Sequence, residues 1–338
     1  MDSMRSGKDD DREVIKIRSL QRYKDLFDED PVTGHMQYRG LCKKWHPDVC
    51  KHPQAEQVFN HITKLYNKIP IATSESKELA LVSEGGKQIN YPYNISDIFE
   101  MGKVYLSKTS IIYEYDKEWI AHHAMARMGV LRILEGIAKT PKINPMVSDL
   151  FFASIASFDT TKGTSILVLP RPKDAYRISD VLRYLGTIEH RHVAWIMSRL
   201  CNIICTLYFF NYCHNGITLD NVFIAPSMHE AYVIGGWHYA TPLGAPLTHV
   251  SKEVYGILPI SVKNKKKASI LTDIESVKNI GRILTKGQDV PKPFVDWLWG
   301  SNAETPFEEF SKWDTALEKS YGKRKFIRLD IPENGILR

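Results

Sequence analysis

The stretch HNGITLDNVF, residues 214–223, is a polar loop between two apolar segments. The segment before it, HVAWIMSRLCNIICTLYFF at 192–210, has the length and composition of a long apolar helix. The segment after it, AYVIGGW at 231–237, is typical of a short strand. The loop begins with His214 and has Asn221 near its end. This pattern predicts a polar loop that a helix and a strand hold inside an α+β domain.

The apolar helix before the loop could also be considered as a membrane span, because residues 195–213 are long enough to cross a bilayer. Arg199 and Asn202 lie in the middle of this stretch, where hydrocarbon would make both side chains costly. The pattern therefore favours a buried helix of a large domain, and no membrane partner is expected.

Composition indicates a soluble globular protein with a cytoplasmic location. Hydrophobic residues make up 43% of the 338 residues and charged residues 25%, with a formal charge of +6. The densest basic run, KNKKK at 263–267, is interpreted as a solvated loop, so no nucleic-acid partner is expected. The odd number of cysteines, five, indicates reduced thiols. Residues 1–13 contain no apolar core, so we expect a disordered tail there and no signal peptide.

Residues 14–70 are predicted to form a small helical domain. The segment 35–45 places apolar residues on one helical face and Arg39, Lys43 and Lys44 on the other. His46-Pro47-Asp48 ends this helix, because a residue that precedes proline is pushed out of the helical region. Helical spacing resumes in 54–69, which predicts a helical hairpin with a loop at its tip.

Residues 38–69 resemble a J-domain, the module of DnaJ-type co-chaperones, through His46-Pro47-Asp48 between a basic helix and an amphipathic helix. The resemblance implies that this tripeptide binds a DnaK-type chaperone and stimulates its ATP hydrolysis. It also implies that Arg39, Lys43 and Lys44 meet an acidic chaperone surface.

Two other interpretations of this loop stay open. Asp48 could cap the following helix, or zinc could be held by a set of four residues. These are Cys42, His46, Cys50 and His52. Their spacing differs from paired Cys-x-x-Cys knuckles and Cys42 belongs to an apolar helical face, so no metal is expected.

Residues 71–92 are interpreted as a linker, and residues from 93 onward resemble a protein kinase domain. The expected landmarks are a β-rich segment at 103–116, a helix at 121–137, a buried strand at 164–172 and a helix at 271–284. The resemblance implies a bilobal α+β fold with an N-lobe at 93–170 and a C-lobe at 171–332, followed by a tail at 333–338. The whole chain is then similar to bacterial and phage proteins that join a J-domain to a kinase-like domain.

Phosphoryl transfer needs a base, a cation on the phosphates and ligands for magnesium. The resemblance places Gly216 at the base, Thr218 at a phosphate-binding lysine, and Gly235 and Gly236 where a magnesium-binding aspartate is expected. Asn221 alone remains of the magnesium ligands. We therefore expect a pseudokinase, with no catalytic residue and no ATP or magnesium cofactor.

Three further positions follow from the same resemblance. Glu114 aligns with the strand lysine and Arg127 with the helical glutamate, which predicts an ion pair of exchanged polarity. His214 and Asp273 align with the scaffold residues that fix the loop. His122 and His123 are expected to face solvent.

These residues together predict a two-domain adaptor. The J-domain would recruit a DnaK-type ATPase chaperone, and the kinase-like domain would bind a client or partner protein. Two alternatives stay open: an atypical protein kinase tethered to a chaperone, and a decoy that competes with host J-proteins.

Overall fold

The computed structural model describes residues 3–22, 25–27, 31–45, 49–66, 76–140, 145–323, 325–331 and 336. Its chain forms two compact units. The first comprises residues 1–73 together with 183–186, and the second comprises residues 74–182 and 187–338. Each unit is built around its own apolar core.

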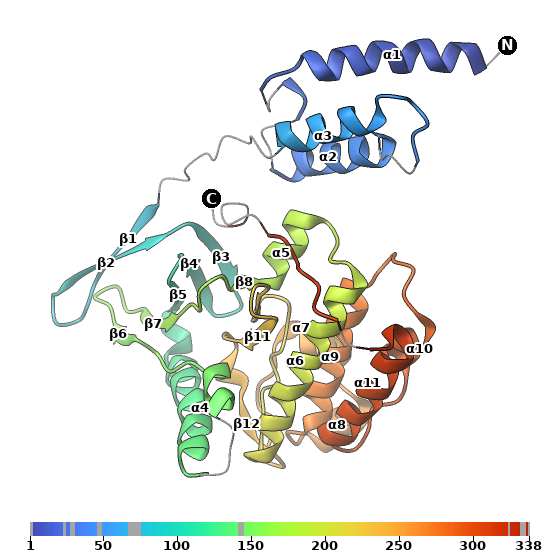
Figure 1. Ribbon diagram of the computed structural model, residues 1–338. Helices are drawn as coiled ribbons and strands as arrows, with labels where there is room; N and C mark the ends of the chain where they lie inside the picture. The colour runs from blue at the N-terminus through green and yellow to red at the C-terminus, as the bar shows by residue number, and fades with distance from the viewer. Residues whose placement is uncertain are drawn as a thin grey trace. The chain divides into compact units, whose positions relative to one another are not determined.

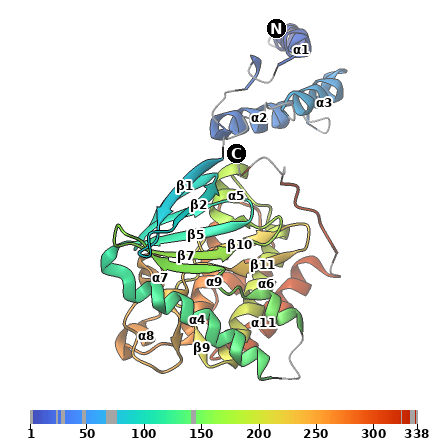
Figure 2. The same ribbon diagram turned by 90° about the vertical axis from the view of Figure 1, so that its left-hand side faces the viewer.

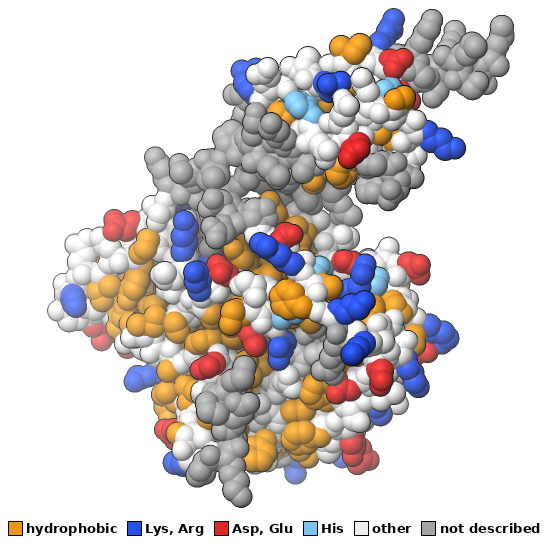
Figure 3. All heavy atoms as spheres, in the orientation of Figure 1, with side chains coloured by type: hydrophobic (Ala, Val, Ile, Leu, Met, Phe, Trp, Pro, Cys, Tyr) orange, Lys and Arg blue, Asp and Glu red, His pale blue; other side chains and the backbone are white. Residues whose placement is uncertain are grey.

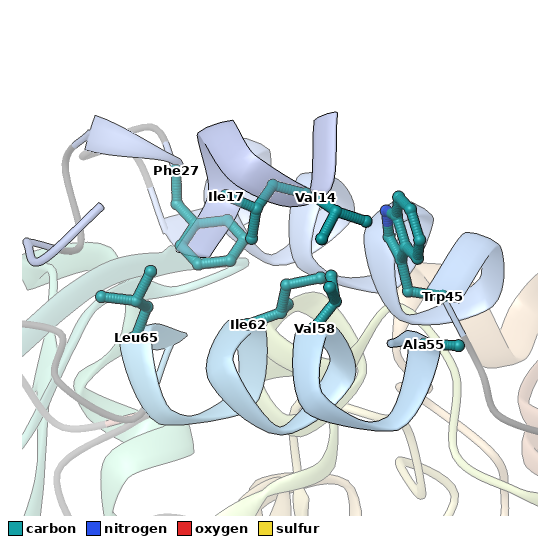
Figure 4. Packing of buried hydrophobic residues seen from close by; sticks show 8 residues of the cluster. All are labelled: Val14, Ile17, Phe27, Trp45, Ala55, Val58, Ile62 and Leu65. Carbon is teal, nitrogen blue, oxygen red and sulfur yellow. The ribbon is translucent and has the colours of Figure 1, made fainter. Parts of the chain in front are cut away.

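The first unit consists of helices α1 (Ser3–Ser19), α2 (Pro31–Trp45) and α3 (Ala55–Tyr66). Helices α2 and α3 lie side by side, and α1 packs on α3 (Figures 1 and 2). Their facing side chains form one fully buried cluster (Figure 4), which contains Val14, Ile17, Phe27, Trp45, Ala55, Val58, Ile62 and Leu65. The helical spacing that predicts α2 and α3 therefore marks the faces that meet.

Part of the expected N-terminal tail belongs to this unit. Helix α1 includes residues 3–13, which composition alone suggested would be disordered. Val14 and Ile17 bury one face of α1 in the core, while Glu13 pairs with Lys44 of α2. The acidic run that looked like a solvated tail thus contributes charge partners for the neighbouring helix.

The second unit is an α+β structure with a sheet-rich lobe and a helical lobe, compatible with a bilobal kinase-like fold. The sheet-rich lobe holds a five-stranded antiparallel sheet in the order β3-β4-β5-β7-β6. The strands are β3 (Ile95–Phe99), β4 (Gly102–Leu106), β5 (Ser110–Tyr115), β6 (Ala156–Asp159) and β7 (Ser165–Pro170). Helix α4 (Ile120–Ala138) packs against β7 (Figure 2).

A separate hairpin precedes this sheet. Strands β1 (Lys77–Val82) and β2 (Gln88–Tyr93) pair in antiparallel register within the segment expected to be a linker. Leu81 of this hairpin is buried in one apolar cluster with Tyr105 and Ile112 of the five-stranded sheet. The hairpin therefore covers one face of the sheet, and α4 lies against the other.

The helical lobe is built around α6 (His190–Phe209) and α9 (Ile270–Leu284), with α11 (Pro306–Tyr321) packed on both (Figure 1). Its other elements are β8 (Tyr176–Arg177), α5 (Ile178–Leu185), β9 (Tyr212–Cys213), β10 (Val222–Ala225), β11 (Glu230–Val233), β12 (Thr241–Pro242), α7 (Lys252–Ile257), α8 (Ile260–Lys265) and α10 (Lys292–Trp299). Short 3-10 turns occur at Lys117–Trp119, Pro145–Leu150 and Trp237–Tyr239, of which the last is η4.

Helix α6 is long and apolar enough to pass a test for a membrane span on length and composition. In the structure, 61% of the most apolar 18-residue stretch of this helix is buried inside the protein. Val193, Met197 and Leu200 are completely buried, as expected for the core helix of a folded lobe.

Candidate functional site

The loop at 214–221 is fixed from below by Asp273 of α9. The Asp273 carboxylate accepts hydrogen bonds from the backbone N–H groups of His214 at 2.6 Å and Asn215 at 2.8 Å. The side chain is completely buried, and burial raises the pKa of Asp273 to about 7, although the two backbone donors favour the charged form. The Asp273 carboxylate thus holds the first two residues of the loop through their backbone.

His214 is a buried neutral base within the loop. Its Nδ1 accepts a hydrogen bond from the Gly216 backbone N–H at 3.2 Å, and its ring meets Trp237 edge-on at 4.8 Å. Burial lowers the pKa of His214 to about 3, because the charged imidazolium would lose its hydration there. The imidazole therefore supports the loop instead of carrying charge.

Aromatic rings occupy the space beside two glycines of the site. A Cβ on Gly216 would lie 2.5 Å from Cδ2 of Tyr239, and one on Gly235 would lie 2.1 Å from the Tyr113 hydroxyl. Gly236 has a φ of +78°, which L side chains rarely adopt. These three positions therefore require glycine in the present packing.

Asn221 and Thr218 hold the end of the loop. The Asn221 side-chain amide donates to the Gly216 carbonyl at 2.8 Å, and the Asn221 backbone N–H donates to the Thr218 carbonyl at 3.2 Å. Thr218 is buried. The site residues predicted on this loop are thus brought together, and Asn221 is bound to the protein backbone.

A cleft of about 180 Å³ lies between the two lobes. It is lined by Ile98, Phe99, Glu100, Val104, Tyr113, Arg177, Thr218, Asp220, Asn221, His238, Tyr239, Ser251 and Glu253. Three carboxylates therefore face one guanidinium. Burial, with the charges of Asp220 and Glu100, raises the pKa of Glu253. Such a lining favours a cationic group over a bare phosphate.

Arg177 connects both lobes at the floor of this cleft. Its guanidinium bonds both oxygens of Asp180 at 2.8 and 3.0 Å, and reaches Asp97 of β3 at 3.1 Å and Asp220 at 4.0 Å. The Arg177 and Asp180 side chains are only 3% and 5% exposed, so this is a buried bidentate pair. A single cation thus links the sheet, helix α5 and the polar loop.

Glu100 closes the cleft from the turn between β3 and β4. Its carboxylate accepts hydrogen bonds from the Tyr239 hydroxyl and from the backbone N–H of Lys252 at the start of α7. Burial and the bond to Glu100 raise the pKa of Tyr239. This contact joins a turn of the sheet-rich lobe to the helical lobe across the opening.

The predicted ion pair between Glu114 and Arg127 does not form. Successive side chains of a strand point to opposite faces, so Glu114 faces away from its neighbours Tyr113 and Tyr115. Glu114 accepts hydrogen bonds from Tyr105 and Thr164, whereas Tyr115 contacts His123 of α4. The assignment of Glu114 to the position facing α4 is therefore wrong by one residue, and Arg127 is exposed.

The two histidines of α4 are buried, contrary to expectation. His122 and His123 are each 8% exposed, because α4 packs between the sheet and η4. His123 Nε2 lies 3.1 Å from the Ile166 carbonyl, and the His122 ring lies 4.5 Å from that of His249. Burial lowers the pKa of both, and the charge of His249 contributes at His122.

Sequence reasoning missed Tyr113, Tyr239, Glu100 and Arg177. The alternation along β5 could have indicated Tyr113, because Tyr113 and Tyr115 share the face opposite Glu114. Nothing local marks Arg177 or Glu100, whose partners lie far away along the chain.

His46, Pro47 and Asp48 lie outside the described residues, as does the side chain of Arg39. Lys43 is exposed on α2. Lys44 pairs with Glu13 and lies 3.9 Å from Asp10 of α1. Of the predicted chaperone contact, the structure therefore describes the side chains of Lys43 and Lys44 and the residues next to the tripeptide.

Both ends of the connection between α2 and α3 are anchored. Trp45 is completely buried and meets the His52 ring edge-on at 5.8 Å. His52 in turn contacts Asp11 at 2.9 Å and accepts from the Gln54 backbone N–H at 3.1 Å. Within the described residues, no group of three or more His, Cys, Asp or Glu could hold a metal ion.

Comparison with known proteins gives a fold-level likeness only. No protein-family model matches the chain, and no curated protein matches it. Among solved structures, the chain is similar to the structure of vaccinia related kinase 3, with 12% sequence identity and a TM-score of 0.46. The alignment covers 71% of this chain and 91% of that chain.

This comparison overturns the expectation that the chain is not an enzyme. The similar structure is named as that of a kinase, so the expectation of a chain without catalytic activity is withdrawn.

Proposed function

We propose that this chain is a J-domain-type co-chaperone or adaptor. Its N-terminal unit recruits a DnaK-type ATPase chaperone and stimulates it through His46, Pro47 and Asp48. Its kinase-like unit binds a client or partner protein. The observation that carries the proposal is the helical hairpin of α2 and α3, whose connection contains this tripeptide and is anchored at both ends by Trp45 and His52.

The anchoring supports a docking role on energetic grounds. A connection whose ends are fixed loses less conformational freedom on binding than a free loop does. Trp45 fixes one end of the connection through its buried indole, and His52 fixes the other through its contacts with Trp45, Asp11 and Gln54. The exposed cation of Lys43 lies one turn or less from the connection and can steer an acidic partner surface.

The kinase-like unit supplies a second surface. Its interlobe cleft is lined by Glu100, Asp220 and Glu253, whose charges suit a basic side chain of a protein partner. Arg177 and Glu100 fix both walls of the cleft, so the surface is preformed. Binding of a protein through this unit, and a chaperone through the other, gives the adaptor role.

The test is ATP hydrolysis by a purified DnaK-type chaperone in the presence of the full chain. The parent should raise the turnover rate several-fold, and His46→Gln should abolish this increase. Lys51→Gln, an exposed change in the same connection but outside the tripeptide, is the matched control and should stimulate as the parent does. Equal stimulation by His46→Gln and the parent would exclude the proposal.

A further inference from the structure

A second concavity lies in the helical lobe, away from the interlobe cleft. It has a volume of about 460 Å³ and is lined mainly by α10 and α11, with one residue from α9. The lining residues that matter below are Lys278, Lys292, Pro293, Trp297, Lys312 and Lys319. Its size is within the range of known ligand sites.

The floor of this groove is a buried ion pair. Lys278 and Glu309 are each 1% exposed, and the Lys278 Nζ atom lies 2.8 Å from Glu309 Oε1. Lys278 also donates to the Gly300 carbonyl at 3.2 Å, and Glu309 Oε2 accepts from the Ala303 backbone N–H at 2.6 Å. The floor is therefore neutral, and three polar contacts fix it.

The rim of the groove carries uncompensated positive charge. Lys312 and Lys319 are exposed on α11, and neither forms an ion pair within the part of the chain that the structure describes. Lys292, at the start of α10, is held by Asp296 at 2.7 Å. Figure 3 shows Lys and Arg side chains interspersed with Asp and Glu side chains on the face of the second unit that it presents. The groove thus presents two free cations above apolar walls.

The two free cations have a defined spacing. Lys312 and Lys319 are seven residues apart on one helix, so they share a face and their Cα atoms lie about 10.5 Å apart along the axis. This distance exceeds the size of one phosphate group. Lysine also lacks the planar fork with which arginine binds phosphate in two places. Two separated carboxylates fit the rim better than one phosphate does.

The geometry points to a docking groove for an acidic peptide segment in the polyproline II conformation. In this conformation residues three apart lie on one face about 9.3 Å from each other, close to the lysine spacing. The carboxylates of such a segment meet Lys312 and Lys319, and the prolines between them pack on the half-buried Pro293, beside the largely buried Trp297. This surface is separate from both sites of the proposed function.

The experiment measures the fluorescence anisotropy of a labelled Glu-Pro-Pro-Glu-Pro-Pro peptide with the full chain at low ionic strength. Binding should weaken about tenfold in Lys312→Gln/Lys319→Gln, because two exposed charge contacts are lost. It should weaken further with added salt. A peptide of the same composition with adjacent glutamates should bind less tightly than the spaced peptide.

Lys265→Gln/Lys267→Gln is the matched control, because it removes the same charge from exposed positions elsewhere on the helical lobe. This variant should bind the peptide as the parent does. Equal weakening by both double variants would show attraction to net charge only and would overturn the proposal. Absence of peptide binding would also overturn the proposal. So would a result in which the chain binds tripolyphosphate, loses that binding in Lys312→Gln/Lys319→Gln, and binds no peptide.

Discussion

His214 shows how burial selects one protonation state at the centre of the loop. Its Nδ1 accepts from the Gly216 N–H, which requires the unprotonated nitrogen, and its ring packs on Trp237. Protonation would bring a charge into a completely buried position without a partner for Nε2. The geometry of the loop therefore depends on His214 staying unprotonated.

The parent should lose stability relative to His214→Phe as pH falls from 7 to 5. The folded pKa of His214, about 3, lies below the ordinary value of 6.5. The unfolded chain therefore takes up the proton first, and stability is lost as pH falls through 6.5 toward 3. The loss approaches roughly 1.4 kcal/mol per pH unit below 6.5.

The measurement is urea unfolding of both proteins at pH 7 and pH 5, followed by tryptophan fluorescence. Because the raised pKa of Asp273 acts in both proteins, taking the difference removes its contribution. A difference in unfolding free energy that is the same at the two pH values would contradict the buried neutral histidine.

The ring of Tyr239 leaves no space for a side chain at Gly216, and a substitution can test this. Gly216→Asp should lower the free energy of unfolding by about 1–3 kcal/mol through overpacking, because its Cβ would meet that ring at 2.5 Å. The cost should shrink when Tyr239→Ala is added. Gly256→Asp is the control, since no atom lies within 4 Å of a Cβ there. Equal costs at Gly216 and Gly256 in urea unfolding would argue against the close contact.

At the scale of elements, strand β5 decides which residues meet α4. Its side chains alternate, with Tyr113 and Tyr115 toward the helix and cleft and Glu114 toward the face covered by the β1–β2 hairpin. Arg177 and Glu100 add polar contacts between the sheet-rich lobe and the helical lobe, beside the packing of α4 on η4.

Arg177→Met should lower the free energy of unfolding by about 3–5 kcal/mol, because it leaves the buried carboxylate of Asp180 without its bidentate partner. Arg177→Met/Asp180→Leu should recover part of this loss, since an apolar pair of similar volume replaces both charges. Urea unfolding monitors the three proteins. Arg328→Met, which removes an exposed partner of Asp330, should change stability far less. A cost at Arg177 no greater than that at Arg328 would refute the buried link.

At the scale of the whole molecule, each of the two units contains buried aromatic residues of its own. Trp45 lies in the core of the first unit, and Trp313 packs with Phe294 and Trp297 in the second. Each unit therefore contains a large buried indole that reports on its own packing.

We expect two unfolding transitions in calorimetry of the full chain. Trp45→Ala should lower or remove only the transition of the first unit, at a cost of about 3–5 kcal/mol. Trp313→Ala should affect only the other transition, by a similar amount. A single cooperative transition that both variants shift equally would show that the two units fold as one.

The sequence by itself determined the elements whose signal is local. Helical spacing predicted α2 and α3, and the apolar run at 192–210 predicted a buried helix, because neighbours along the chain set these patterns. The helix α9 was expected from the resemblance to a kinase domain. The assignment of Asp273 as a scaffold residue rests on the resemblance to a known loop and stays a prediction. The J-domain assignment and its chaperone stay predictions.

Only the tertiary structure decided which side chains face one another. The burial of His122 and His123, the orientation of Glu114 and the fourfold contact of Arg177 depend on elements that are far apart in the chain. A slip of one residue on a strand reverses the face of every side chain, so an alignment that is nearly right still assigns the wrong partner to Glu114. Long-range packing selects the register, and the local pattern of residues does not contain that information.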